Sequence, residues 1–193
     1  MLVLGLQGSP RKKGNTNYLL DRFLEQAVAF GTETVKIQVA EKDIRPCLGC
    51  NGCMKTGQCV IQDDDMFTEM YPLLQKANII VAATPVFFYG PSAQLKALID
   101  RSQALWSRKY TLKIPDPLAE TRKGFLLSVG ATGGKQLFDG IKLVAKYFFD
   151  AAGARNSGAL TFRKADRAGD LQKLPGHLEE IETSARILFE QTG

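Results

Sequence analysis

The sequence predicts an α/β protein built on one doubly wound sheet of five parallel strands, with helices on both faces. Short apolar runs alternate with longer segments of helical periodicity along the whole chain, which is typical of parallel strands joined by helical crossovers. The 193 residues contain no internal repeat and no low-complexity segment, and this length is ordinary for one domain. We therefore expect residues 1–193 to form a single domain, with a cysteine-rich loop at residues 46–60.

The first elements follow from hydrophobic periodicity and from the residues that interrupt it. Leu2–Leu6 is a short apolar run that predicts a buried strand. Residues 16–30 carry apolar side chains at helical spacing, and Gly31 is a natural end for that helix. Val35–Val39 alternates between apolar and polar residues and predicts a second, half-exposed strand. Residues 63–77 are expected to form a helix, because three aspartates stand in its first turn, where negative charge is favourable.

The middle of the chain predicts a central strand, a helix and a loop. Ile79–Ala83 is a β-branched apolar run, so the third strand is expected at the centre of the sheet. Residues 92–106 show leucine and isoleucine at helical spacing and predict a helix. Residues 108–122 contain Pro115 and Pro117 and are expected to form a loop. Two roles stay open for this loop: it covers a bound ligand, or it forms a subunit interface.

The remaining elements continue the alternation of strands and helices. Phe125–Val129 predicts the fourth strand, which runs into a glycine-rich turn. Residues 136–152 are expected to form a helix that Gly153 ends. Ala159–Phe162 predicts the fifth strand, and residues 174–191 predict a last amphipathic helix. Five strands alternating with helices require short right-handed crossovers, and these give a doubly wound sheet.

Composition and charge exclude several classes of protein. A hydrophobic share of 45% and a charged share of 23% are typical of a soluble globular chain. We see no apolar run long enough to span a bilayer and no leader segment, so we expect a cytoplasmic protein without membrane contact. The net charge of +5 is modest, and the basic residues form no DNA-reading motif, so nucleic-acid binding is not expected. A phosphate-bearing cofactor or an acidic protein partner would suit this charge.

The sequence offers little to a mechanism based on side-chain acids and bases. The single histidine, His177, falls in the expected last helix, where we predict that it is exposed to solvent. No Ser-His-Asp arrangement and no pair of carboxylates suggests hydrolysis. We therefore expect no catalytic side chain and a cofactor that carries the chemistry.

The segment Gly8–Asn17 follows the first strand, where open parallel sheets bind their ligands. Gly8 and Gly14 allow the backbone to approach an anion closely, and the next helix presents free N–H groups at its positive end. Short polar or charged side chains add donors to this loop: Ser9, Arg11, Asn15, Thr16 and Asn17. The segment is neither a Walker loop nor a dinucleotide fingerprint. The alternative is an ordinary polar turn with a helix cap at Asn15 or Thr16.

Two further loops are expected at the same edge of the sheet. Thr84–Gly90 ends the third strand and is rich in aromatic residues, whereas Ser128–Gly134 ends the fourth and is rich in glycine. Aromatic side chains suit a planar, partly apolar ring, and backbone N–H groups suit its polar edge. The alternative for the aromatic residues is core packing, which we expect for one of Phe87, Phe88 and Tyr89.

The four cysteines, Cys47, Cys50, Cys53 and Cys59, fall within one stretch of thirteen residues. Spacings of two residues in a turn-rich loop are typical of a [4Fe–4S] cluster, which needs four thiolates. A zinc ion would also accept four thiolates, although zinc ligands more often form two separated pairs. Free or redox-active thiols are the third alternative, and structural disulfides are not expected in a cytoplasmic chain.

These motifs resemble the NADPH-dependent FMN reductase superfamily. Gly8–Arg11 with Gly14–Thr16, and Pro85–Gly90 with Ser92–Lys96, carry the resemblance, which extends from residue 1 to about residue 135. It implies a flavodoxin-like sheet with strand order 2-1-3-4-5, a bound FMN, and NAD(P)H as a candidate reductant. The long acidic loops of electron-carrier flavodoxins are not recognisable.

The resemblance assigns two groups of residues to FMN, and the charge of a reduced flavin points to a third. The phosphate would bind to the first loop, through Ser9, Arg11, Asn15, Thr16 and Asn17. The isoalloxazine ring would pack against the second loop, at Pro85, Val86, Phe87, Phe88 and Tyr89. The reduced ring would be stabilised by the third loop, with Lys135 as a further candidate beside Ser128, Gly130, Thr132 and Gly133.

The compact cysteine pattern resembles the iron–sulfur flavoproteins of anaerobic archaea and bacteria. This resemblance implies a [4Fe–4S] cluster on the four cysteines, and homodimers or homotetramers in which the cluster lies near an FMN and a neighbouring subunit. The expected function is electron transfer between a ferredoxin-type carrier and a small oxidant. Two alternatives stay open: a cluster-free NAD(P)H-dependent FMN or quinone reductase, and a thiol or metal redox sensor.

Overall fold

Five parallel strands form one sheet at the centre of the molecule, in the order β2-β1-β3-β4-β5. The structure is a computed structural model that describes residues 1–190 of the chain. The strands are β1 (Leu2–Gln7), β2 (Glu33–Gln38), β3 (Ile79–Pro85), β4 (Lys123–Val129) and β5 (Arg155–Phe162). The predicted fold class and strand order are confirmed.

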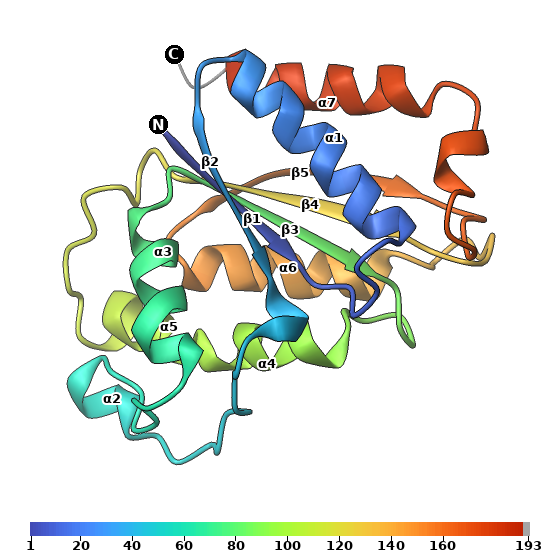
Figure 1. Cartoon of the computed structure of the whole chain (residues 1–193). Helices are drawn as coiled ribbons and strands as arrows, with labels where there is room; N and C mark the ends of the chain where they lie inside the picture. Colours follow the sequence, from blue (N-terminus) through green and yellow to red (C-terminus); the bar gives the residue numbers. More distant parts are fainter. Residues whose placement is uncertain (191–193) are drawn as a thin grey trace.

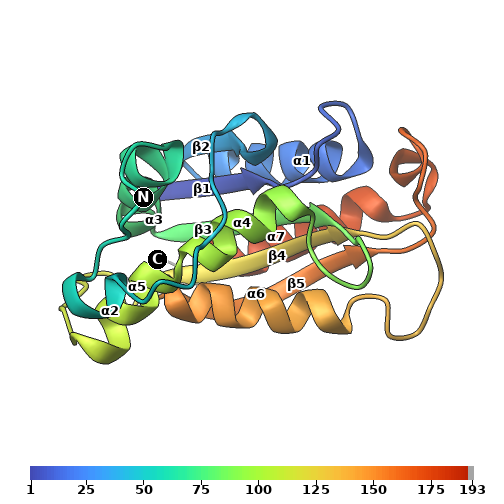
Figure 2. The ribbon, with the colours of Figure 1, turned by 90° about the horizontal axis from the view of Figure 1, so that it is seen from below.

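Helices cover both faces of the sheet, as Figure 1 and Figure 2 show. The α-helices are α1 (Asn15–Ala29), α2 (Cys53–Thr56), α3 (Tyr71–Lys76), α4 (Ala93–Arg101), α5 (Gln103–Trp106), α6 (Asp139–Ala151) and α7 (His177–Glu190). Four shorter turns are η1 (Val39–Glu41), η2 (Met66–Met70), η3 (Ser107–Thr111) and η4 (Leu171–Lys173). Helices α1 and α7 lie on one face, and α3 to α6 lie on the other. Among the described residues, no helix has the length and apolar character needed to cross a membrane.

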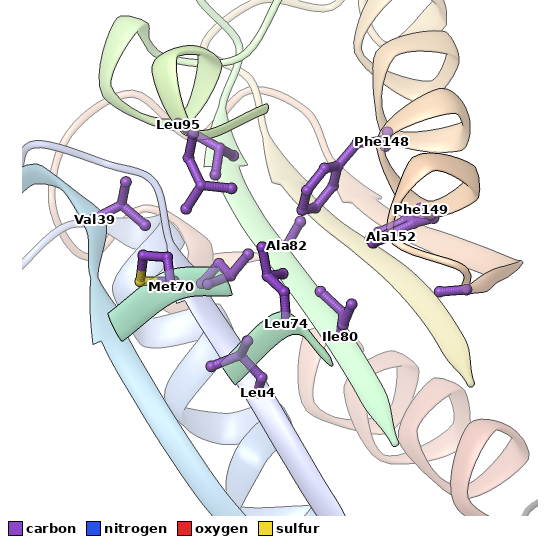
Figure 3. Close-up of a cluster of buried hydrophobic side chains, with 14 of the residues drawn as sticks. Leu4, Val39, Met70, Leu74, Ile80, Ala82, Leu95, Phe148, Phe149 and Ala152 are labelled. Carbon is purple, nitrogen blue, oxygen red and sulfur yellow. The ribbon is translucent and has the colours of Figure 1, made fainter. Parts of the chain in front are cut away.

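Each face of the sheet has its own hydrophobic core, because successive side chains of a strand point to opposite faces. Val3 and Val81 pack beneath α1 and α7, whereas Leu4 and Ile80, their neighbours in sequence, pack beneath α3, α4 and α6. Figure 3 shows the second core, in which Leu4, Ile80 and Ala82 of the sheet meet side chains of the covering helices. The central strands β1, β3 and β4 are buried almost throughout, as the continuous apolar runs predicted.

Gly124 of β4 lies where a helix side chain approaches the sheet backbone. A Cβ at this position would overlap the ring of Phe149 on α6, which is fully buried. We expect Gly124→Ala to lower the free energy of unfolding by about 1–3 kcal/mol through overpacking. Urea unfolding of the full chain measures this. Gly134→Ala is the matched control, because a Cβ there meets no atom within 4 Å. An unchanged stability of Gly124→Ala would contradict this packing.

The segment from residue 92 to residue 122 differs most from its prediction. The single helix expected over residues 92–106 is divided at Ser102, whose hydroxyl donates to the Leu98 carbonyl at 3.0 Å. Ser107 donates in the same way to Gln103 at 2.9 Å, and residues 107–111 continue as a wide π-helical turn. Serine side chains that bond back to the preceding turn compete with the helix and bend it. The expectation of a loop from residue 108 is therefore wrong for residues 108–111.

Other element boundaries shift by a few residues. The aspartates at 63–65 precede η2, and Asp64 alone caps its first turn by accepting a hydrogen bond from the Phe67 amide at 3.2 Å. The expected helix over 136–152 begins at Asp139, and the last helix begins at His177, one residue after Gly176 with a φ of +74°. Gln191, the predicted end of that helix, lies outside the described residues.

His177 is buried, so the prediction that it is exposed to solvent is wrong. Only 8% of the residue is exposed, and its Nδ1 lies 2.7 Å from the Leu174 carbonyl oxygen. Because a carbonyl only accepts, Nδ1 donates to it, and Nε2 forms a hydrogen bond of 3.1 Å with the Tyr18 hydroxyl. His177 therefore joins α7 to α1, a structural role that its place near the chain end did not reveal.

Candidate functional site

Three loops meet at the carboxyl edge of the sheet, on the right of Figure 1. The β1–α1 loop is joined to β3 by a hydrogen bond from the Gly8 amide to Ala83 at 2.7 Å, and Ser92 at the start of α4 donates to the Gly8 carbonyl. Strands β3 and β4 are joined beneath their loops by Ser128, which donates to Thr84 at 2.9 Å. The sheet thus brings the three predicted loops together at one edge.

The N-terminus of α1 is open to a ligand. Gly14 occupies the cap position in an extended conformation, and among residues 1–190 no side chain caps this helix end and no acidic residue stands in its first turn. Gly8 is required nearby, since a Cβ there would lie 2.9 Å from Leu95 and 3.0 Å from the Ala83 oxygen. An uncapped helix N-terminus with a partial positive charge is a suitable site for a phosphate.

Ser9 and Thr16 are both buried against this helix end. Ser9 shapes the loop, because its hydroxyl accepts from the Arg11 amide at 3.1 Å and its carbonyl accepts from Gln38 at 2.8 Å. Beneath the loop, Gln7 is fully buried, and its Nε2 finds no hydrogen-bond partner within the described part of the chain. The loop therefore fits a phosphate group through its backbone and its open helix end.

The structure gives Asn15 a role that the sequence did not indicate. Its Nδ2 donates to Ala165 and Arg167 at 3.2 and 2.9 Å, and its Oδ1 accepts from the amides of Gly169 and Leu171 at 3.1 and 3.2 Å. All four bonds go to the segment after β5. The Asn15 side chain thus fixes residues 165–171 against the first loop, and its backbone N–H remains at the helix end.

Asn15→Asp is expected to weaken FMN binding by at least about tenfold and to destabilise the FMN-free chain by about 1–3 kcal/mol. The carboxylate keeps the acceptor for Gly169 and Leu171 but leaves the buried oxygen of Ala165 and the part-buried oxygen of Arg167 without this donor. Flavin fluorescence titration and urea unfolding measure the two effects. Asn156→Asp, at an exposed position on β5, is the control. Equal behaviour of the two variants would contradict the role of Asn15.

Two other predicted phosphate ligands direct their side chains elsewhere. Asn17 donates to Asp21 at 2.7 Å and accepts from Lys36 at 2.7 Å, which places its amide toward β2. Arg11 is exposed, and its guanidinium donates to the Asp166 carbonyl at 3.2 Å. With exposed side chains of the adjoining segment it forms a basic rim around the edge: Arg11, Arg163, Lys164 and Arg167. Arg163, Lys164 and Arg167 are absent from the sequence-based prediction, because only the fold brings their segment beside Arg11.

Residues 87–90 form a tight aromatic turn. Phe87 and Gly90 exchange two backbone hydrogen bonds of 2.9 Å, and Phe88 and Tyr89 between them have φ values of +48° and +64°. This is the backbone of a type I′ turn, which aromatic residues adopt only at a steric cost. Phe87, Phe88 and Tyr89 are all exposed, so the expectation that one of them packs in the core is wrong. Strained, exposed aromatic residues indicate a ligand surface rather than a packing role.

The third loop has a buried base and an exposed tip. Gly130 lies in the base, where a Cβ would be 2.5 Å from a terminal methyl of Leu137, so a larger residue would displace that side chain. Thr132 and Gly133 lie at the exposed tip, and Pro85 and Val86 lie half-buried between this loop and the first. Lys135 is exposed. The predicted ring-binding residues thus share one edge, with the side chain of Ser128 committed to β3 beneath them.

The four cysteines line a single pocket together with Arg101, Gln103 and Ala104. All four thiols are free; Cys47 and Cys50 are exposed, and Cys53 and Cys59 are half-buried. Among residues 1–190 no three metal-ligating side chains stand close enough to hold one metal ion. A single zinc ion requires that close spacing, whereas a cubane cluster binds one thiolate on each of four irons and spaces them further apart. The four thiols are the donors that a metal ion or a cluster would use, and all four face one pocket.

The backbone of this cysteine segment, residues 46–60, is strongly curved. Gly49, Asn51 and Gly57 have φ values of +64°, +58° and +70°, and Cys53 begins the one-turn helix α2. Ser107 of η3 lies against α2, with its Oγ 3.6 Å from Cys53 Sγ. Turns of this kind allow a short segment to direct several thiols to one side.

The cysteine pocket and the carboxyl edge of the sheet lie at opposite ends of the molecule. The segment leaves β2, passes below the sheet and reaches the far end of α4, as both views show. Arg101, Gln103 and Ala104, which line the pocket, lie at the end of α4 and the start of α5. The chain therefore presents two separate candidate sites.

Comparison with known proteins gives consistent results. The family model for NADPH-dependent FMN reductases matches residues 1–154. An iron–sulfur flavoprotein of Methanocaldococcus jannaschii is 44% identical over 105 residues, which cover 54% of this chain and 53% of that protein. An iron–sulfur flavoprotein of Methanosarcina thermophila is 37% identical over 138 residues, which cover 70% of this chain and 68% of that protein. The match thus spans about half the length of the first relative and two thirds of the second.

Solved structures show the same fold at low sequence identity. A flavone reductase superposes with a TM-score of 0.71 at 19% identity, covering 100% of this chain and 63% of that one. The NAD(P)H:quinone oxidoreductase from Methanothermobacter marburgensis superposes with a TM-score of 0.67 at 15% identity, covering 97% and 94%. At these identities the likeness supports the fold alone.

Proposed function

Because the chain belongs to the NADPH-dependent FMN reductase family, we propose that it is an FMN-dependent oxidoreductase that also carries a [4Fe–4S] cluster. In this proposal it passes electrons between a ferredoxin-type carrier and a small-molecule oxidant. The observation that carries it is the joint presence of two sites in one chain. Four free thiols line one pocket, and an open helix end adjoins an exposed aromatic turn at the other end.

Each of the three loops at the carboxyl edge would bind a different part of FMN. The first-turn amides of α1 and the backbone around Ser9 would hold the phosphate, and the basic rim would balance its charge. The aromatic turn would pack against the isoalloxazine ring and exclude water from one side of it. Backbone N–H groups at Thr132 and Gly133 would face the ring's polar edge, where a reduced flavin is negative. FMN, when bound, supplies both one-electron and two-electron transfer.

The cysteine segment would hold the cluster through Cys47, Cys50, Cys53 and Cys59. A cluster supplies transfer of one electron at a time. Electron transfer weakens steeply with distance, and the two sites lie at opposite ends of one chain. We therefore propose a homodimer or homotetramer in which the cysteine segment of one copy approaches the FMN of another. Free thiols stay reduced in a reducing compartment, so the proposed location is the cytoplasm.

The proposed carrier is a small acidic protein, because the chain has a formal net charge of +5 and a basic rim at the FMN edge. Complementary charge speeds encounter, and salt screens it. We expect the rate of reduction by a bacterial-type ferredoxin to fall about tenfold or more between low salt and about 0.5 M salt. Stopped-flow absorbance in anaerobic buffer measures it. A rate that does not change with salt would remove the electrostatic part of the proposal.

The second candidate function is a cluster-free NAD(P)H-dependent FMN or quinone reductase. The observation in its favour is that the family model matching residues 1–154 describes NADPH-dependent FMN reductases. Turnover with each reductant separates the two candidates. Reduction by ferredoxin but not by NADPH supports the first, and fast turnover with NADPH by a chain that binds no iron supports the second.

A further inference from the structure

A buried ion pair closes the cysteine pocket on its inner side. Arg101, at the end of α4, bonds Asp64 through two N–H groups at 2.6 and 3.2 Å, and neither side chain is exposed to solvent. Asp64 also accepts from the amides of Arg45 and Phe67 at 3.3 and 3.2 Å. The carboxylate is thus fully bonded, and it fixes the orientation of the guanidinium.

The same guanidinium holds both ends of the cysteine segment. Its Nη1 donates to the Arg45 carbonyl at 2.9 Å, and its Nη2 donates to the Ile61 carbonyl at 3.0 Å. Arg45 precedes all four cysteines and Ile61 follows them. One side chain therefore closes the segment into a loop, and it does so through protein groups alone.

Arg101 also lines the pocket that the four cysteines share. Its Nε is buried and has no hydrogen-bond partner among the described residues. Burial lowers the pKa of Arg101, but the hydrogen bond to Asp64 contributes to raising the pKa above its ordinary value. The guanidinium thus lies at the wall of the pocket that the four thiols share, and it retains one unused donor.

Stability alone gives no reason for this arrangement. Replacing a buried ion pair by apolar residues of similar volume is often neutral or stabilising, because two charges must be desolvated. An N–H donor and a positive charge beside an iron–sulfur group, by contrast, raise its reduction potential and hold its ligands in place.

We propose that Arg101 is a positioning residue of the cysteine pocket: Asp64 fixes it, its Nη groups hold the two ends of the cysteine segment, and its Nε–H donates to a sulfur of the bound group. The last part of this proposal rests on the proposed cluster. The first part concerns the chain itself and applies with or without the cluster.

Arg101→Lys tests the whole proposal in the anaerobically purified full chain. Lysine keeps the charge but cannot bridge two carbonyls and a carboxylate in one plane. We expect the variant to keep FMN, to lose iron to a chelator at least about tenfold faster, and to show a more negative midpoint potential for the iron–sulfur signal. Arg122→Lys is the matched control. Arg122 is equally buried and pairs with Asp116, but it bonds Gln75, Ala77 and Ala152 away from the pocket.

The double variant Arg101→Met with Asp64→Leu keeps the test valid if Arg101→Lys does not fold. It removes the pair without leaving a buried charge. Hydrogen exchange of the metal-free chain is expected to be at least about tenfold faster at residues 46–60 than in the unmodified chain. Unchanged exchange there, or an unchanged midpoint potential in Arg101→Lys, would overturn the proposal. An unmodified chain that binds FMN but no iron would refute the proposed cluster, while the exchange experiment would still decide the role of Arg101.

Discussion

Replacing Gly14 by aspartate is expected to weaken FMN binding by roughly a hundredfold or more while leaving the FMN-free chain as stable or slightly more stable. Gly14 is the cap residue of α1 and makes no side-chain cap, and a Cβ there meets Arg11 at an ordinary distance of 3.4 Å. Aspartate is a preferred cap and complements the helix dipole. The same carboxylate would stand where the phosphate binds, and two unit charges 4 Å apart repel by about 4 kcal/mol at an effective dielectric constant of 20.

The opposite signs of these two effects make the Gly14 experiment specific. A variant that only disturbs folding would lower both stability and affinity. Gly14→Asn is the matched control, since asparagine has the same shape and caps a helix without adding charge. Isothermal titration with FMN and urea unfolding of the apo chain measure the two quantities. If Gly14→Asp and Gly14→Asn bound FMN equally well, the phosphate would not lie at the end of α1.

Replacing Cys50 by serine is expected to remove most of the iron and sulfide from the chain and to leave FMN content unchanged. Cys50 lines the cysteine pocket and is exposed, so replacing its thiol by the smaller hydroxyl does not disturb the hydrophobic core. A [4Fe–4S] cluster needs a thiolate on each iron, and serine is a poor substitute. FMN is expected to stay because its loops lie at the opposite end of the chain.

The control for Cys50→Ser is Leu48→Ser, an exposed residue between two of the cysteines. Iron, acid-labile sulfide and flavin are determined in both variants after anaerobic purification. The two variants are expected to differ in iron and to agree in flavin. Retention of iron in Cys50→Ser would mean that the metal is bound elsewhere or that Cys50 is not a ligand.

The parts of the fold that were predictable depend on local pattern. The continuous apolar runs at β1, β3 and β4 are buried on both faces of the sheet. A short run of this kind is typical of a central strand in a parallel sheet that helices cover on both sides. Glycine-rich and aromatic loops at strand ends were predictable for the same reason, since parallel strands bring their carboxyl ends to one edge.

The parts that were not predictable depend on contacts between distant residues. Asn15 bonds a segment about 150 positions further along the chain, and Arg101 joins residues on both sides of the cysteines. The burial of His177 depends on Tyr18 across two helices. No periodicity or spacing in the sequence reports such pairs. The division of the helix at Ser102 had a signal, a serine in mid-helix, but only the structure shows that its hydroxyl bonds back to Leu98.

The two-site account is tested most directly by the metal, sulfide and flavin content of the full chain after strictly anaerobic purification. It predicts about four iron and four sulfide atoms for each FMN, with a broad iron–sulfur absorbance beneath the flavin bands. On reduction, the iron–sulfur signal is expected in the electron paramagnetic resonance spectrum of the unmodified chain and not in that of Cys50→Ser. Stoichiometric FMN without iron or sulfide would contradict the account and leave the cluster-free reductase.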